Sequence, residues 1–279
     1  MSDESRRDDS SGRVSDRIPP LVDLHNHFVP GVDDGARTID EAIGALKELF
    51  ESGVTHVTTT PHLSASRASG PRKVEIQERY EELRAAAAQA VPDLSLGLAY
   101  EVRLDDPDAD LSDRSLGLGD RHLLVEFSML MMPPFSIETL DAAARQDWVP
   151  VLAHPERYAG VEARYALIRT WRDAGVVMSV NAASLWGRYG REAELVARRM
   201  LADGAVDIMA SDHHARPGRS ATLRQAWDRL AETGHDEVAD LLLSGNPRAI
   251  LAGRDPLPVP AIHLEEGWLE RLKRIVGRS

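Results

Sequence analysis

Seven short apolar runs, separated by segments with helical spacing, dominate this sequence. The runs span residues 21–25, 54–61, 94–102, 122–128, 149–155, 176–184 and 206–212. Most of them lack a clean alternation of polar and apolar residues, which is typical of parallel strands covered on their outer face. Strands that alternate with helices in this way predict an α/β fold, either a barrel or a doubly wound sheet.

A polar residue stands at or just after the end of each run. These residues are His25, His62, Glu101, Glu126, His154, Asn181 and Asp212. In a closed parallel barrel the carboxyl ends of the strands meet at one rim, whereas an open sheet spreads them along a line. If these seven polar residues converge on one site, such as a metal site, a barrel is favoured over an open sheet. We therefore predict a distorted, TIM-barrel-like (β/α)7 barrel with the site at the C-terminal rim of the strands.

Helices are predicted between the runs. The first is expected to begin at a capping box at Thr38 and to end near Gly53. The later ones are predicted at 73–90, 137–146, 161–174, 192–203 and 221–232, with a final short helix from Asn246. We expect one barrel domain over residues 21–253, because the chain of 279 residues is long enough for one large α/β domain.

Two extensions flank the expected barrel. Residues 1–20 are rich in Ser, Asp, Arg and Pro and cannot bury apolar surface, so they are predicted to be disordered. Residues 254–279 are predicted to form a C-terminal extension. Its amphipathic helix, 261–276, is expected to pack on the barrel surface or to bind a partner.

The composition excludes several functions. The 33 Lys and Arg residues against 45 Asp and Glu give a net charge of −12, which disfavours nucleic-acid binding. The absence of cysteine excludes disulfides, thiolate zinc sites and a cysteine nucleophile. No apolar run approaches the ~18 residues of a membrane span, and no segment resembles a signal peptide, so we expect a cytoplasmic protein.

The first apolar run leads into two histidines and a carboxylate pair, in LVDLHNHFVPGVDDG (21–35). Two nearby histidines alone are a weak signal, since such residues are often solvated or hydrogen-bonded. Their coincidence with polar groups at the other strand ends favours a metal centre. The nine candidate ligands are His25, His27, Asp34, His62, Glu101, Glu126, His154, Asp212 and His214. Imidazole and carboxylate ligands without thiolate suit manganese, iron or zinc, and several ions can share such groups.

Five motifs, in this order, resemble the polymerase and histidinol phosphatase superfamily of metal-dependent phosphoesterases, and within it the bacterial capsule-type tyrosine-protein phosphatases. They are DLHNHFVPGVDDGA (23–36), TTPH (59–62), VEFSM (125–129), AHPERY (153–158) and ASDHHARPGR (210–219). The resemblance covers residues 21 to about 253. It implies up to three divalent ions, with Mn²⁺ expected.

The resemblance also implies how the ligands are shared. His25, His27, Glu101 and Asp212 would hold one ion, Glu101 with Glu126 and His154 a second, and Asp34, His62 and His214 a third. Two ions about 3.5–4 Å apart can bridge a water molecule and supply hydroxide for in-line attack on phosphorus.

Two arginines near the candidate ligands are expected to bind phosphate, because guanidinium binds phosphate bidentately. Arg157 lies three residues past His154, and Arg219 lies five past His214. Both occupy positions where the family resembled has phosphate-binding arginines. We therefore predict Arg157 and Arg219 as substrate-binding and catalytic residues, with Asp212 as a catalytic ligand.

Further polar residues are candidates for supporting roles. We expect Asp23 to accept a hydrogen bond from a ligand imidazole, and Ser211 and Asn181 to orient neighbouring ligands. His213 is a candidate substrate contact. The apolar segment MLMMPPF (129–135) fits a rim for an aromatic substrate side chain, an oligomer contact, or simple loop packing.

The resemblance implies a phosphoric monoester hydrolase that acts on phosphotyrosine in proteins. Its expected substrate is a bacterial tyrosine kinase of capsule or exopolysaccharide synthesis. An alternative is a small-molecule phosphatase acting on histidinol phosphate or a sugar phosphate. A third possibility is a non-catalytic regulatory binding module, which would be marked by missing ligands.

Overall fold

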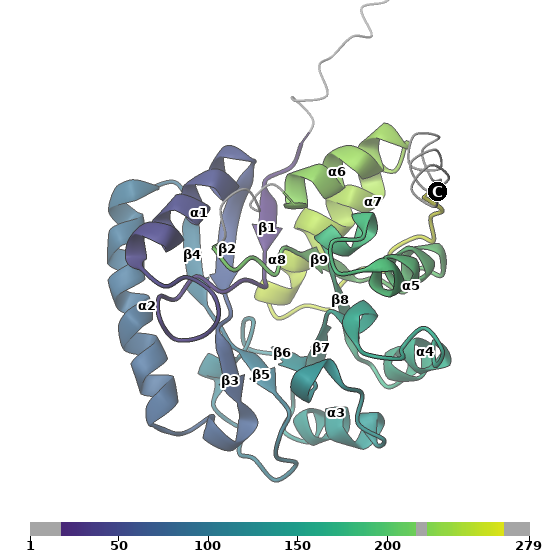
Figure 1. Ribbon diagram of the computed structural model, residues 1–279, viewed down its shortest axis with the longest axis horizontal. Helices are drawn as coiled ribbons and strands as arrows, with labels where there is room; N and C mark the ends of the chain where they lie inside the picture. The colour runs from purple at the N-terminus through teal and green to yellow at the C-terminus, as the bar shows by residue number, and fades with distance from the viewer. Residues whose placement is uncertain (1–17, 216–221, 265–279) are drawn as a thin grey trace, which may run out of the picture.

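The computed structural model describes residues 18–215 and 222–264. The N-terminal extension up to residue 17, and the predicted C-terminal helix beyond residue 264, lie outside the described residues. Figure 1 shows the strands in the middle of the molecule with helices around them. No helix in the described ranges is both long and apolar enough to span a membrane.

All strand pairs are parallel, as predicted, and they form two sheets. The first has the order β1-β2-β4 and the second the order β3-β5-β6-β7-β8-β9. The strands are β1 (Leu21–Asp23), β2 (Val54–Thr59), β3 (His62–Ser64), β4 (Ser95–Leu98), β5 (Glu101–Arg103), β6 (His122–Glu126), β7 (Val149–Ala153), β8 (Val177–Asn181) and β9 (Ile208–Ala210). The strand ladders establish a parallel α/β architecture, but do not by themselves close a barrel.

The seven predicted runs contain these nine strands, because two runs are broken. The run 54–61 breaks after Thr59, where Pro61 has no N–H to donate to a ladder. The run 94–102 breaks at Tyr100, whose N–H donates to the carbonyl of Leu116 instead of to a neighbouring strand. The predictions that His62 and Glu101 end strands were therefore wrong, since His62 begins β3 and Glu101 begins β5.

Backbone hydrogen bonds continue past the end of β1 on both of its sides. On one side Asp212 N donates to His25 O at 2.9 Å, and His27 N donates to His213 O at 2.9 Å. On the other side Thr60 N donates to Asn26 O at 2.8 Å. These bonds place the segment after β1 between the segments that follow β9 and β2.

The described residues contain the seven predicted helices in the predicted order, and one short helix, α7 (Asp236–Asp240), that the sequence did not predict. They are α1 (Ile39–Glu51), α2 (Pro71–Ala90), α3 (Ser136–Ala144), α4 (Ala166–Asp173), α5 (Arg191–Ala202), α6 (Thr222–Glu232), α7 (Asp236–Asp240) and α8 (Asn246–Leu251). Thr38 caps α1 by accepting a hydrogen bond from Glu41 N. The helix predicted from 161 begins only at Ala166, because Arg164 N bonds Val161 O in a tight three-residue turn.

Apolar side chains form two separate clusters. The smaller one joins residues of β1, β6, β7, β8 and β9 with a few residues outside these strands. Its members are Val22, Leu24, Ala99, Leu118, Leu124, Val151, Ala153, Val177, Ile208 and Ile250. The larger cluster holds most of the remaining buried apolar side chains and packs the helices onto the sheets. Because side chains alternate along a strand, Glu126 shares the face of Leu124, so the polar strand ends lie above the smaller cluster.

Candidate metal centre

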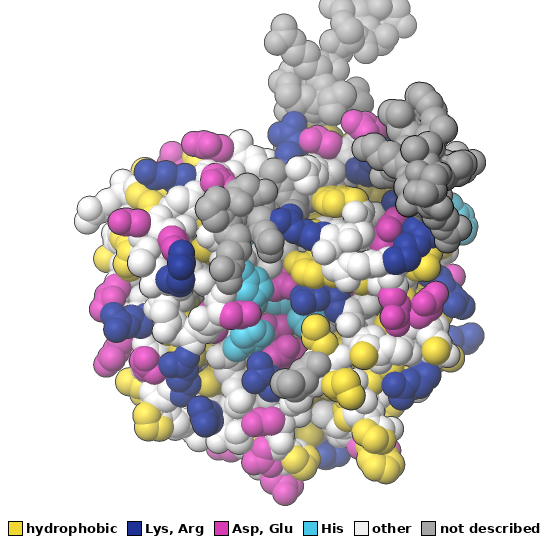
Figure 2. Space-filling view, in the orientation of Figure 1, with side chains coloured by type: hydrophobic (Ala, Val, Ile, Leu, Met, Phe, Trp, Pro, Cys, Tyr) yellow, Lys and Arg dark blue, Asp and Glu magenta, His cyan; other side chains and the backbone are white. Residues whose placement is uncertain are grey.

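All nine predicted ligands lie in four overlapping groups, in which the ligand atoms are within 4.8 Å of one another. The groups are His25, His27 and Asp212; His25, Glu101 and His154; His62, Glu101 and Glu126; and His27, Asp34, His62 and His214. The grouping differs from the predicted partition, because Glu126 lies with His62 and Glu101 rather than with His154. Figure 2 shows histidine and acidic side chains gathered near the middle of one face, with basic side chains beside them.

The two histidines after β1 are held by backbone on both sides. Residues 25 and 27 lie on the same side of an extended segment, because side chains alternate. That segment is fixed by the hydrogen bonds to residues 60, 212 and 213. Both imidazoles are fully buried, and their Nε2 atoms lie 3.6 Å (His25) and 3.4 Å (His27) from Asp212 Oδ1.

Glu101 is the central carboxylate and is fully buried. Its Oε1 lies 2.9 Å from His154 Nε2 and 3.3 Å from His25 Nε2. Its Oε2 lies 2.9 Å from His62 Nδ1 and 3.5 Å from His27 Nε2. One carboxylate therefore contacts four imidazoles, which is the arrangement of a bridging ligand.

The group that contains Asp34 is the most open to solvent. The side chain of Asp34 is 66% exposed, and its Oδ1 lies 3.5 Å from His62 Nε2 and 3.4 Å from His214 Nε2. The loop that carries Asp34 folds back on itself at Gly35, where an added Cβ would overlap the carbonyl oxygen of His27. The glycine is therefore required for this close approach.

Two ligands sit on left-handed backbone at the ends of their strands. His154 has φ 40° and ψ 52°, and Asp212 has φ 49°. Non-glycine residues rarely adopt positive φ, although His and Asp do so more readily than most. The sharp turn after β7 and after β9 directs each side chain toward the centre instead of along the strand.

Charges within the centre shift its pKa values. Burial alone would lower the pKa of His27, but Asp212 and Asp33 raise it to about 10. Burial would raise the pKa of Asp212, yet His25 and His27 hold it well below its usual range. Burial opposes ionisation of Glu101 too, but His25 and other imidazoles lower its pKa. These carboxylates are therefore ionised, which is the state that binds a cation.

Several buried side-chain nitrogen and oxygen atoms of the centre, which could ligate a metal, make no hydrogen bond within the described part of the chain. They are Nδ1 and Nε2 of His25, Nε2 of His27, Nδ1 of His62, Nδ1 of His154 and Oε2 of Glu101. His62 Nδ1 and Glu101 Oε2 are 2.9 Å apart, yet neither satisfies the other as a hydrogen bond. Because buried polar atoms are normally paired, nitrogen and oxygen donors that converge in this way fit divalent cations.

Asp212 also anchors the predicted arginine. Arg157 lies in a short helix, η5 (Pro155–Arg157), and its Nη1 donates to Asp212 Oδ2. Its guanidinium stacks on the ring of Tyr189 at 4.1 Å from the ring centroid. Asn181 Nδ2 also donates to Asp212 Oδ2, at 2.7 Å, which is the orienting role predicted for Asn181. Arg219 lies outside the described residues.

Other supporting residues behave differently from the predictions. Asp23 accepts hydrogen bonds from Ser211 Oγ at 2.6 Å and Asn26 Nδ2 at 3.1 Å, rather than from a ligand imidazole. The bond from Ser211 ties β1 to the segment after β9, and the bond from Asn26 is local. His213 is buried against Phe28, and its Nδ1 accepts from Ala215 N, so its ring is packed inside the protein.

Two residues beside the ligands were not found from the sequence. Asp33 Oδ2 lies 2.8 Å from His27 Nδ1. In the sequence, the only feature that pointed to Asp33 was its position next to Asp34. Arg103 Nε donates to Glu126 Oε1 at 3.1 Å, and its place two residues after Glu101 on one strand was the available signal.

The apolar segment after β6 lies beside the loop that carries Arg157. Ala159 N donates to Leu130 O at 3.0 Å, and Met131 forms a β-bridge with Ala159. Met131 and Phe135 are exposed, at 60% and 69%, whereas Met132 is buried. Part of the segment therefore packs as a loop, and part presents apolar surface.

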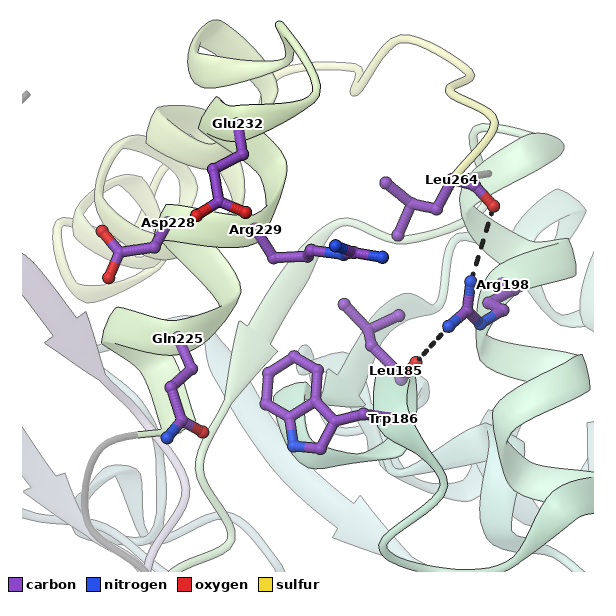
Figure 3. A pocket seen from close by; sticks show the side chains of 8 residues that line it. All are labelled: Leu185, Trp186, Arg198, Gln225, Asp228, Arg229, Glu232 and Leu264. Carbon is purple, nitrogen blue, oxygen red and sulfur yellow. Dashed lines mark hydrogen bonds between the residues drawn. The ribbon is translucent and has the colours of Figure 1, made fainter. Parts of the chain in front are cut away.

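A separate pocket of about 350 Å³ lies between α5, α6 and the short helix η6 (Ala182–Trp186). Its lining residues are Leu185, Trp186, Arg198, Gln225, Asp228, Arg229, Glu232 and Leu264. Figure 3 shows Arg229 extending toward Leu264, and Arg198 bonding the carbonyls of Leu185 and Leu264. This pocket contains none of the candidate ligands.

Together, the fold and the clusters define a parallel α/β protein with a candidate multi-metal centre near the carboxyl ends of β1, β6, β7 and β9 and the first residues of β3 and β5. The chain belongs to the CpsB/CapC family, described as capsular polysaccharide synthesis, whose model matches residues 21–252. This match confirms the family-level resemblance found in the motifs.

Similar proteins share most of this chain. It is 28% identical over 239 residues to tyrosine-protein phosphatase CpsB of Streptococcus pneumoniae, covering 83% of this chain and 98% of that protein. It is 24% identical over 228 residues to tyrosine-protein phosphatase YwqE of Bacillus subtilis, covering 80% and 88%. A crystal structure from work on these two proteins, described as unique metal-dependent tyrosine phosphatases, matches the fold with a TM-score of 0.74. It has 21% identity and covers 88% of this chain and 100% of that one.

Proposed function

We propose that this chain is a metal-dependent protein-tyrosine phosphatase, a phosphoric monoester hydrolase acting on phosphotyrosine in proteins. The observation that carries the proposal is the convergence of five imidazoles and four carboxylates in overlapping groups. Relatives named tyrosine-protein phosphatases support the substrate class. The absence of cysteine agrees with hydrolysis that uses no cysteine nucleophile.

We infer that the strands make up a distorted (β/α)7 barrel, in which β2 with β3, and β4 with β5, act as single interrupted strands. The hydrogen bonds between residues 25–27 and 212–213 support closure between β1 and β9. The smaller apolar cluster contains residues of five strands. It supports a barrel interior that is separate from the larger cluster between the sheets and the helices. The family match over residues 21–252 supports a domain of residues 21–253 flanked by two extensions.

The nine groups would hold up to three divalent ions, with Mn²⁺ as the ion we expect. From the distances, we assign one ion to the open group of Asp34, and two to the three buried groups, which share His25 or Glu101 with one another. When bound, the ions would lower the pKa of a water molecule and offset negative charge on the phosphoryl group. The donor set lacks thiolate, so it also admits iron or zinc.

The chain's own residues would orient the phosphate ester. Asp212 holds the guanidinium of Arg157 beside the ligands, and Tyr189 fixes its plane by stacking. We propose that Arg157 binds two phosphoryl oxygens through its planar fork. Arg219 is proposed as a second such arginine, and Asp212 as a catalytic ligand. The family's link with capsular polysaccharide synthesis supports a bacterial tyrosine kinase as the substrate protein.

The test compares substrates on Mn²⁺-loaded protein, with and without a chelator. We expect the highest kcat/KM on a phosphotyrosine peptide, loss of activity on chelation, and recovery with Mn²⁺. Faster turnover of histidinol phosphate or a sugar phosphate would instead establish a small-molecule phosphatase. Fewer than two bound ions per chain, with no turnover of any substrate, would establish a non-catalytic binding module.

A further inference from the structure

Arg103 stands at the candidate centre on the same face as a ligand. It lies two residues after Glu101 on β5, so both side chains point to the same side of the sheet. In register it is opposite Glu126 on β6, and its Nε donates to Glu126 Oε1 at 3.1 Å. The side chain of Arg103 is 38% exposed, whereas that of Glu126 is 6% exposed. The guanidinium therefore lies between the buried ligands and solvent.

Arg103 and Arg157 lie at opposite ends of one continuous series of polar contacts. Each contact in the series is 3.6 Å or shorter. From Arg103 to Arg157 the intervening side chains are Glu126, His62, Glu101, His25 and Asp212. The two arginines thus border the group of ligands at two separate places, Arg103 beside Glu126 and Arg157 beside Asp212.

The chemistry of the centre requires cations near a phosphate. Its acidic side chains would repel a phosphate dianion wherever bound ions did not offset them. A guanidinium keeps its charge under all working conditions and presents several donors in one plane. The bond to Glu126 uses Nε, so it does not occupy the two terminal nitrogens of Arg103. Asp105 lies nearby and already accepts two hydrogen bonds from Ser66.

We propose that Arg103 is a further phosphoryl-binding residue, which contacts the substrate beside Glu126, whereas Arg157 contacts it beside Asp212. The inference rests on the proposed function, because both arginines would bind the phosphoryl group of a phosphate ester. Arg103 would donate from its two terminal nitrogens to phosphoryl oxygens, while its Nε stays bonded to Glu126.

The experiment measures binding of inorganic phosphate to Mn²⁺-loaded protein by calorimetry, together with the Mn²⁺ content. The variants are Arg103→Gln and Arg103→Lys, with Arg121→Gln as the matched control. Arg121 is an exposed arginine whose Nη1 pairs with Asp255 at 2.7 Å, at the other end of β6. We expect Arg103→Gln to raise the Kd of phosphate about tenfold or more, with partial recovery in Arg103→Lys. The Mn²⁺ content and the control should match the wild type.

Two results would overturn the inference. An unchanged phosphate Kd in Arg103→Gln would show that the guanidinium does not bind the anion. A loss of Mn²⁺ from Arg103→Gln would show that Arg103 acts by holding Glu126. Failure of the proposed function looks different, because wild-type protein would then bind phosphate but leave phosphotyrosine peptides unhydrolysed.

Discussion

The Nδ1 atom of His27 lies 2.8 Å from Oδ2 of Asp33, while the neighbouring Asp34 reaches two other histidines. Asp33 also accepts hydrogen bonds from Gly35 N at 2.9 Å and from His62 N at 3.2 Å. One carboxylate therefore orients an imidazole and fixes the loop around it. Adjacent aspartates in this sequence have separate roles, one supporting a ligand and the other facing the open group.

Asp33→Asn is expected to weaken metal binding about 10- to 100-fold, because the carboxylate that orients His27 loses its charge. Titration of the metal-free protein with Mn²⁺ measures the effect. Asp40→Asn is the control, since Asp40 is an exposed acid in the first turn of α1. Equal Mn²⁺ affinity in the two variants would show that Asp33 does not support metal binding.

Glu101→Gln should lose more metal than Asp34→Asn. Glu101 is buried and belongs to two of the four groups, whereas Asp34 is largely exposed and belongs to one. After loading with Mn²⁺, elemental analysis should find at least one ion fewer per chain in the Glu101 variant. Circular dichroism checks that both variants are folded. The same ion count in both would contradict a bridging position for Glu101.

Gly35→Ala should destabilise the fold by about 1–3 kcal/mol, since the added Cβ would overlap the backbone of His27. Gly44→Ala is the matched control, because an added Cβ there meets nothing within 4 Å on the exposed side of α1. That change should stabilise the protein by up to about 1 kcal/mol. Denaturant unfolding measures both, and a neutral Gly35→Ala would refute the close approach.

Stability should fall with acid through His122, a buried residue at the start of β6. Burial, with help from Arg121 and against Asp255, lowers the pKa of His122 from 6.5 to about 4. The unfolded chain therefore binds this proton first, so the free energy of unfolding decreases as pH falls from about 6.5 to about 4. Between these pH values, the free energy of unfolding of His122→Gln should decrease less than that of the wild type. If the free energy of unfolding changed with pH equally in the wild type and in His122→Gln, the lowered pKa of His122 would be contradicted.

Local pattern predicted the order of most elements and the candidate ligands that the fold brings together. Short apolar runs and capping signals depend on neighbouring residues, so α1 and the polar strand ends could be placed from the sequence. The break at Tyr100 could not, because it depends on a hydrogen bond to Leu116, far along the chain. Nor could the left-handed backbone of Asp212, which arises from packing between distant segments.

The roles of single side chains were the least predictable part of the site. Asp33 and Asp34 are chemically identical neighbours, and only the fold of the loop separates their partners. Arg103 was marked only by its place two residues after Glu101, and this spacing does not predict a bond to Glu126 on another strand. Motif spacing finds the candidate metal ligands more readily than the residues that surround them.

The hydrogen bonds between residues 25–27 and 212–213 also bear on when the centre can form. On the ribosome the two histidines after β1 are made early, whereas Asp212 and His214 emerge only when nearly the whole domain has been synthesised. A nascent chain that stops before residue 212 cannot assemble the group of His25, His27 and Asp212. Contacts this distant in sequence form slowly, so completion of the centre is a late event in folding. Ions bound there would join the first-made and last-made parts of the domain.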